Sequence, residues 1–292
     1  MSVPEFLYKY MTADTAKIVL ETGRLRWQSP CQFNDVNELQ KMPLLEPSFN
    51  DGWKLYSKKL VEMIYHDDVI NFTIYAPWTQ VILTEILQYK VLGYCKDKAL
   101  ELVENKIPSL KNDIEQILRT STEVNNDGSL RFYCLSEDEN NNAMWGYYGE
   151  GHLGCMFEFG HIEELSTPFH EAEKVSYSNE SVVVGSALDI LLYGPSAELK
   201  KNTRLAIYFH KTNEWANEKE WRVMIKRPNP TNETYTDFKF YPKELTSITF
   251  GARILDVKKL EIMDVIREQY PHCKIFQMIV INGISQRVEV EC

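Results

Sequence analysis

The sequence lacks the features that mark several common classes of protein. Its six cysteines form no CxxC pair, and no group of cysteine and histidine has the spacing of zinc ligands. The cysteines are therefore expected to be reduced, mostly buried thiols. There is no apolar run of about 18 residues, and the start of the chain does not resemble a signal peptide. We expect a cytoplasmic protein with no membrane segment and no bound metal.

The usual nucleotide and hydrolase signatures are missing as well. The chain contains no GxxxxGK[ST], no strand-linked GxGxxG, no GxSxG and no HExxH. Positive charge is scarce, because 32 Lys and Arg face 42 Asp and Glu, for a net charge of −10. Broad binding to phosphate backbones needs concentrated positive charge. The composition therefore favours a protein or a small molecule as partner over nucleic acid, and it leaves an oligomer open.

Apolar and aromatic residues are plentiful. The chain has 292 residues, of which 44% are hydrophobic and 12% aromatic, enough for one large or two fused units. Strands and helices are expected without regular alternation, which favours an α+β class with a mixed or antiparallel split sheet. The expected strands are 6–10, 24–27, 130–135, 153–159, 220–226, 236–241, 247–250, 274–281 and 286–290.

One long region has helical periodicity instead. Apolar residues recur at three- and four-residue steps in 81–92 and 99–118, with Pro77 and Pro108 as expected helix breakers. We therefore expect a helical insertion over 51–124 in an α+β core formed by 1–50 and 125–292.

The segment Trp215–Ile225 (WANEKEWRVMI) is the most informative in the chain. Four charged residues lie between two tryptophans and lead into an apolar tail. In an extended segment, Glu220 and Arg222 share one face, and Trp221 lies on the other. Glu220 either points into a cleft or simply pairs with Arg222, an interaction that contributes about 0–1 kcal/mol when exposed.

A second carboxylate and a histidine extend this set. Glu218 shares the face of Glu220 if the strand begins early, and two close carboxylates raise one pKa, which suits acid–base chemistry. Arg222 would lower that pKa again. His152 lies between glycine-rich turns and has either a structural or a catalytic role. The candidate catalytic residues are Glu220, Glu218 and His152.

Polar and aromatic residues elsewhere are candidates for ligand binding. In Leu7–Tyr10, the two tyrosines share one strand face and the lysine lies on the other, so the strand is either part of the core or the wall of a pocket. Asn34 and Asp35 either close an Asx-turn or order a ligand. The candidate binding residues are Tyr8, Lys9, Tyr10, Asn34, Asp35, Trp145, Tyr148 and Arg222.

Several blocks, in this order, resemble a widespread bacterial family of unknown function. The blocks are LYKY at Leu7–Tyr10, the FND loop at 33–38, CLS at 134–136, MWGYYGEGHLG at 144–154, and Lys211–Arg222, which ends in EKEWR. This family is similar, more distantly, to the ADP-ribosyltransferase fold. That resemblance implies that Tyr8 or Tyr10 contacts NAD, that Tyr148 lies near the nicotinamide, and that Glu220 is the key carboxylate.

The resemblance implies an enzyme that uses NAD as a substrate, for ADP-ribosyl transfer or NAD hydrolysis, with a toxin or phage-defence effector as its setting. Two alternatives stay open. One is a non-catalytic module that binds a nucleotide or a partner through its aromatic cleft. The other is a metal-free hydrolase or nuclease that uses Glu218, Glu220 and His152.

Overall fold

The computed structural model describes residues 2–35, 38, 43–66, 70–122, 128–165, 167–227 and 233–290, except for the side chains at 110, 115 and 117–122. The chain divides into two compact units. The first consists of 1–38, 125–179 and 209–292, and the second of 39–124 and 180–208. The expected domain boundary at 124/125 lies outside the described residues, as does part of the FND loop.

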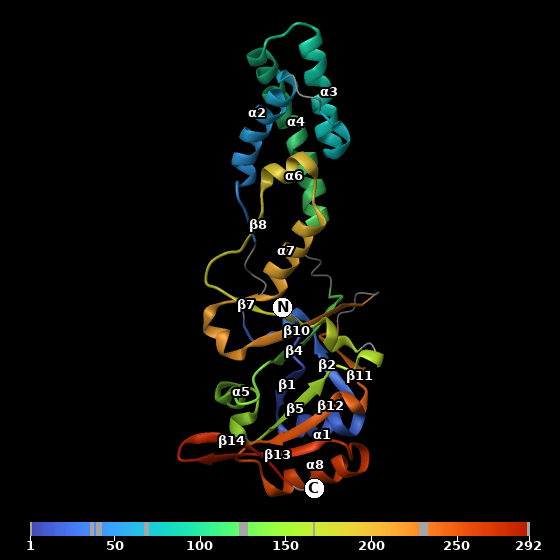
Figure 1. The fold of residues 1–292 in the computed structure, drawn as a ribbon, viewed down its shortest axis with the longest axis vertical. Helices are drawn as coiled ribbons and strands as arrows, with labels where there is room; N and C mark the ends of the chain where they lie inside the picture. The colour runs from blue at the N-terminus through green and yellow to red at the C-terminus, as the bar shows by residue number, and fades with distance from the viewer. Residues whose placement is uncertain are drawn as a thin grey trace. The chain divides into compact units, whose positions relative to one another are not determined.

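The first unit is built on a ten-stranded mixed sheet (Figure 1). The order β11-β2-β4-β1-β5-β12-β13-β14 forms its main path, and β10 pairs with β4 and β6. The β12–β13 pair is parallel and the other pairs are antiparallel. The strands are β1 (Phe6–Met11), β2 (Arg24–Gln28), β4 (Leu130–Ser136), β5 (Cys155–Gly160), β6 (Glu173–Lys174), β10 (Glu220–Lys226), β11 (Tyr235–Lys239), β12 (Leu245–Phe250), β13 (Lys274–Ile281) and β14 (Ile284–Glu289). The expected α+β class is confirmed.

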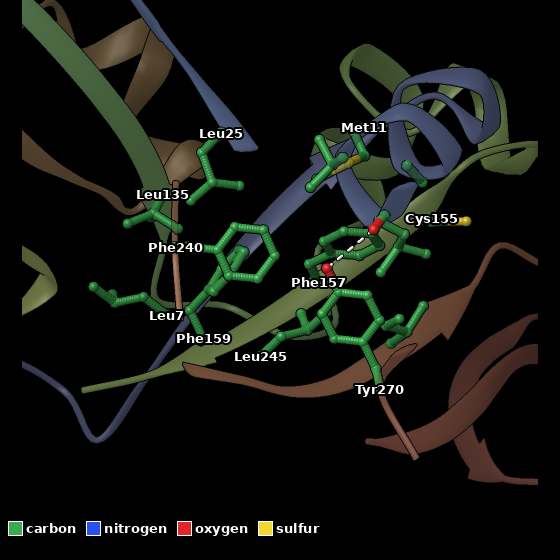
Figure 2. Packing of buried hydrophobic residues seen from close by; sticks show 14 of the residues in the cluster. Leu7, Met11, Leu25, Leu135, Cys155, Phe157, Phe159, Phe240, Leu245 and Tyr270 are labelled. Carbon is green, nitrogen blue, oxygen red and sulfur yellow. Dashed lines mark hydrogen bonds between the residues drawn. The ribbon is translucent and has the colours of Figure 1, made fainter. Parts of the chain in front are cut away.

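Two helices pack against each other beside this sheet, α1 (Ala13–Thr22) and α8 (Asp256–Gln269). Helix α1 begins where the Thr12 hydroxyl accepts a hydrogen bond from the Thr15 N–H, and it ends at Gly23, whose φ of 62° is left-handed. The core beneath combines apolar residues of β1, β4, β5 and β12, among them Leu7, Leu135 and Phe157 (Figure 2).

Short elements complete the first unit. Helix α5 (Asn142–Tyr147) begins at Asn141, whose side chain accepts from two backbone N–H groups. Strands β7 (Ser176–Tyr177) and β9 (His210–Lys211) form a small parallel pair. The 3₁₀ helix η6 (Asn213–Glu218) leads directly into β10.

The second unit is mainly helical and has an apolar core of its own. Its helices are α2 (Phe49–Tyr65), α3 (Pro77–Val91), α4 (Lys96–Thr122), α6 (Ala187–Tyr193) and α7 (Ala197–Tyr208), and β3 (Leu44–Leu45) pairs with β8 (Val183–Gly185). Within it, the Tyr56 hydroxyl lies 2.7 Å from the Thr79 hydroxyl, which donates to the Leu191 carbonyl.

Pro108 does not end a helix as expected, because it lies inside α4. A proline in a helix interior costs about 3 kcal/mol. Val103, Ile107 and Ile114 are buried on both sides of it in the core of this unit. Each such side chain gains roughly 1.5–3 kcal/mol on burial, so the packing outweighs the cost.

None of the helices in the described parts of the chain is both long enough and apolar enough to cross a bilayer.

Candidate functional site

The backbone between η6 and β10 brings two carboxylates together, although not as expected. Strand β10 begins at Glu220, so Glu218 does not share its face; it ends the 3₁₀ helix instead. Lys219 lies between them with a left-handed φ of 45°. Trp221 and Val223 enter the hydrophobic core, while Glu220 and Arg222 lie on the opposite face, as the alternation predicts.

Lys211 joins the two carboxylates. Its ammonium lies 2.7 Å from Glu218 Oε2 and 3.1 Å from Glu220 Oε2. Its side chain is only 3% exposed, so this is a buried ion cluster and not a surface pair. The ammonium also lies 4.9 Å from the centre of the Trp215 ring.

Arg222 binds the same cluster from β10. Its Nε donates to Glu220 Oε1 at 2.7 Å, and its Nη2 donates to Glu220 Oε2 at 2.9 Å. Nη2 also bonds Glu38, a residue of the polar loop that follows β2. Three carboxylates therefore surround two cations, and the cluster carries a charge of −1 when every member is ionised.

The pKa values of the cluster move in different directions. Burial tends to raise the pKa of Glu220, but the neighbouring Arg222 and Lys211 outweigh burial and hold that pKa well below its usual range. Burial raises the pKa of Glu38, and the same two cations offset only part of this rise. Burial tends to lower the pKa of Lys211, and the adjacent carboxylates raise it above its usual range. Glu220 is therefore held ionised, and Glu38 is more easily protonated than Glu220.

Tyr148 extends the cluster toward the polar loop. Its hydroxyl donates to Glu218 Oε1 at 2.6 Å and accepts from Asn34 Nδ2 at 2.7 Å. Burial and the Glu218 carboxylate raise the pKa of Tyr148 far above that of a free phenol, so it stays a neutral donor. The backbone N–H of Glu220 donates a hydrogen bond to the Tyr177 hydroxyl at 2.8 Å.

A cavity of about 200 Å³ lies beside the cluster, wholly within the first unit. Its wall combines β1, β4, β10, α5 and the loop after β2. Its lining includes Tyr8, Lys9, Tyr10, Asn34, Cys134, Tyr148, Glu220 and Arg222. The cavity has a carboxylate that is ionised, phenol rings that can stack on a flat group, and hydroxyl and amide groups that can hydrogen-bond a ligand.

Strand β1 presents its tyrosines to this cavity. The Tyr10 hydroxyl donates to the Asp138 carbonyl at 2.6 Å, which fixes the ring. Burial, with Glu158 as a further cause, raises the pKa of Tyr8 to about 12. Lys9 also reaches the cavity wall, and its ammonium donates to the Cys134 carbonyl at 2.7 Å.

Three sequence-predicted residues are not among the described residues that line the cavity: Asp35, Trp145 and His152. Trp145 is fully buried and meets the Tyr10 ring edge-on at 5.2 Å, so it supports the wall from behind. His152 stacks on Trp145 at 5.8 Å, and burial together with Arg253 lowers its pKa. Asp35 is buried in the loop after β2. The structure therefore does not bring His152 to the two glutamates.

Sequence reasoning did not select Glu38 and Lys211 as site residues, although both are buried in the cluster. Lys211 opens the Lys211–Arg222 block and Glu38 ends the FND loop, so the family-like blocks contained the signal. The described residues include no group of His, Cys, Asp and Glu placed to hold a metal ion.

Comparison with known proteins identifies one domain. Residues 144–223 match the model of DUF2971, a protein family of unknown function. The matched segment runs from α5 to β10, and it contains Tyr148, Lys211, Glu218, Glu220 and Arg222. No curated protein and no solved structure matches the chain.

Proposed function

We propose that the first unit is an NAD-consuming enzyme of the ADP-ribosyltransferase type, which transfers ADP-ribose or hydrolyses NAD. The observation that carries this proposal is the position of Glu220. It is a buried carboxylate, held ionised by two cations, in the wall of a cavity lined by Tyr8, Tyr10 and Tyr148.

The chemistry needs such a carboxylate. The bond between the ribose C1′ and the nicotinamide nitrogen breaks, and neutral nicotinamide leaves with the bonding electron pair. The sugar passes through an oxocarbenium-like state, as in glycoside cleavage. A carboxylate that binds the ribose 2′-hydroxyl stabilises this positive charge. Water or an acceptor then forms the new bond to C1′ and releases one proton.

Glu220 can take a ribose hydroxyl while it keeps its bonds to Arg222 and Lys211. A carboxylate accepts about four hydrogen bonds. Arg222 and Lys211 provide three donors, one to Oε1 and two to Oε2, and the Cys134 thiol is a further, weaker donor. The ribose hydroxyl would be an additional donor, and the two cations would keep the carboxylate oriented.

The volume of the cavity fits one end of NAD better than it fits the whole molecule. Pockets that enclose whole drug-sized ligands measure roughly 300–1,000 Å³. A cavity of about 200 Å³ therefore suits the nicotinamide–ribose end, with the rest of the molecule outside. Tyr148 lines this cavity, and its ring can stack on the nicotinamide while its hydroxyl stays bound to Glu218 and Asn34.

We further propose that the protein acts in the cytoplasm, on a protein or small-molecule acceptor, as a toxin or phage-defence effector. The resemblance to ADP-ribosyltransferases suggests this role, and the net charge of −10 disfavours a nucleic-acid acceptor.

A non-catalytic binding module is the second candidate. One observation favours it, because both oxygens of Glu220 already accept hydrogen bonds within the cluster. In that case Glu220 would fix the shape of a recognition cavity and would not take part in bond cleavage.

An assay with NAD labelled in its adenylate half distinguishes the enzyme from the binding module. The labelled NAD is incubated with the protein and a cell extract, and nicotinamide release and labelled products are measured. An enzyme releases nicotinamide, and Glu220→Gln reduces the rate by at least about 100-fold, the scale of losing one electrostatic contact to the transition state. The exposed Glu163→Gln is the matched control and keeps the rate. Release that persists unchanged in Glu220→Gln would remove Glu220 from the mechanism.

A further inference from the structure

One edge of β4 is open where the sheet splits. Strand β10 pairs with β4 at every position from Leu130 to Ser136 and so occupies one edge. On the other edge, Ser136 pairs with Tyr8 of β1, and Phe132 pairs with Gln28 of β2. Within the described residues, no strand pairs with this edge of β4 between those two positions.

Lys9 closes this gap. Its ammonium donates to the Cys134 carbonyl at 2.7 Å, where a backbone N–H would bond in a continuous ladder. It also lies 5.0 Å from the centre of the Tyr133 ring. In the described part of the chain, no carboxylate forms an ion pair with Lys9. Among the described residues, this half-buried cation thus has a dipolar partner and an aromatic ring but no counter-ion.

A second cavity of about 390 Å³ meets the first at this point. Lys9, Gln28 and Cys134 line both cavities. Successive side chains of β1 divide between them, because Tyr10 lines the first cavity and Met11 the second. Lys9, Gln28 and Cys134 therefore separate two cavities that lie on different faces of β1, and both cavities are within the first unit.

The second cavity has an apolar wall and an excess of positive charge. Its apolar lining includes Met11, Val19, Leu25 and Phe132. Its lining has three cations, Lys9, Arg24 and Arg26, and one carboxylate, Asp237. Arg26 binds both Asp237 oxygens, at 3.0 and 3.3 Å, and Arg24 donates to the Asp237 carbonyl at 3.0 Å. Two positive charges therefore remain unmatched in the lining.

We propose that this second cavity is a binding site for a small molecule with an apolar body and one anionic head. The apolar side chains receive the body, and Lys9 provides the counter-charge for the head. The Cys134 carbonyl offers the Lys9 ammonium only a dipole, whereas an anionic head adds the attraction between two full charges to the hydrogen bond, so the ligand would draw the ammonium away from that carbonyl. Since Lys9 and Cys134 also line the first cavity, occupation of the second would alter the wall of the first.

Octanoate and octan-1-ol test the proposal, because they share a chain length and differ in the charge of the head. Binding to the full chain is measured by titration calorimetry. Octanoate binds the wild type, and octan-1-ol binds at least about tenfold more weakly. Lys9→Met lowers the affinity for octanoate by about tenfold, or about 1.4 kcal/mol, and changes the affinity for octan-1-ol by no more than about twofold. Arg26→Ala also lowers the affinity for octanoate and not that for octan-1-ol.

Two control variants locate the effect. Arg267→Ala removes an exposed arginine that pairs with one acid on α8, as Arg26 does with Asp237, and it leaves octanoate binding unchanged. Asn34→Ala alters the lining of the first cavity only, and it also leaves octanoate binding unchanged. Thermal melting confirms that each variant is folded.

The proposal is overturned by any of four results: no binding of octanoate at millimolar concentration, equal affinity for octan-1-ol, octanoate binding to Lys9→Met that is as tight as to the wild type, or a loss of octanoate binding in Asn34→Ala. The site does not depend on NAD chemistry, so these results would leave the proposed enzymatic function to its own test.

Discussion

Arg222 holds the Glu220 carboxylate in a fork, with Nε at 2.7 Å from Oε1 and Nη2 at 2.9 Å from Oε2. Both residues lie on the same face of β10, and the arginine side chain is 1% exposed. Two parallel bonds fix both the position and the plane of the carboxylate. The orientation on which the proposed chemistry depends is thus set before any ligand binds.

Removing the arginine should therefore damage the fold. Arg222→Met would leave Glu220 and Glu38 buried, with Lys211 as the one cation that still pairs with them among the described residues. Breaking a buried ion pair by deleting one partner costs about 3–5 kcal/mol. Urea unfolding should show a loss of this size, whereas Arg267→Ala, which breaks an exposed pair, should change stability by no more than about 1 kcal/mol. A loss below about 1 kcal/mol for Arg222→Met would contradict a buried cluster.

The stability of the cluster should depend on pH in two opposite ways. The folded pKa of Glu220 lies below its ordinary value of 4.5, so its contribution is present above pH 4.5 and is lost as the pH falls. The folded pKa of Glu38 lies above 4.5, so its contribution is present below that pH and is lost as the pH rises through the folded pKa.

Urea unfolding of Glu220→Gln and Glu38→Gln between pH 7 and about pH 3 separates these contributions. The deficit of Glu220→Gln relative to the wild type should stay constant above about pH 4.5 and shrink as the pH falls below it. Glu38→Gln should gain stability relative to the wild type as the pH rises above 4.5. If both differences stay constant across this range, neither carboxyl has the shifted pKa that the geometry implies.

Tyr148 and Tyr147 form a natural matched pair. Tyr148→Phe removes the donor to Glu218 and the acceptor for Asn34, and a hydrogen bond to a charged group contributes about 1.5–3 kcal/mol. Tyr147 is adjacent but 73% exposed, so Tyr147→Phe should change stability by less than about 0.5 kcal/mol. Thermal and urea unfolding of the two variants should differ accordingly; equal effects would mean that the link to Glu218 contributes nothing.

Gly154 allows a second matched comparison, in the turn before β5. A Cβ at this position would lie 2.1 Å from the Met11 carbonyl oxygen, which is backbone and cannot move aside cheaply. Gly154→Ala should therefore destabilise the protein by about 1–3 kcal/mol. In α5, a Cβ at Gly146 meets nothing within 4 Å, and Gly146→Ala should stabilise by about 0.5–1 kcal/mol. If the two substitutions change the free energy of unfolding in urea with opposite signs, the crowded environment of Gly154 and the open environment of Gly146 are both confirmed.

Local patterns were enough to predict much of the first unit. The limits of β10 match the predicted 220–226, because alternation along a strand is visible within seven residues. The cap at Thr12 and the left-handed Gly23 define α1 through side-chain chemistry that is equally local. The α+β class followed from the irregular order of such elements.

The structure departs from the local expectation in two places. Pro108 has the chemistry of a helix breaker, yet burial of its neighbours keeps α4 continuous through it. Glu218 would extend β10 by alternation, but the left-handed backbone at Lys219 ends η6 and turns the chain before the strand begins.

The composition of the ion cluster could not be predicted, because it depends on contacts between distant parts of the chain. Glu38 meets Arg222 across 184 residues of sequence. Lys211 is close to Glu220 in sequence, but its role depends on how β9 and η6 bring its ammonium to two carboxylates at once. Periodicity contains no information about either arrangement.

Saturation-transfer NMR of NAD with the Glu220→Gln variant tests the central claim most directly, because a variant that consumes NAD slowly lets the bound orientation be observed. If the cavity beside residue 220 takes the nicotinamide–ribose end, the nicotinamide protons should receive the strongest saturation, and unlabelled nicotinamide should compete for it. Stronger saturation of the adenine protons, or no transfer to NAD at all, would contradict the account.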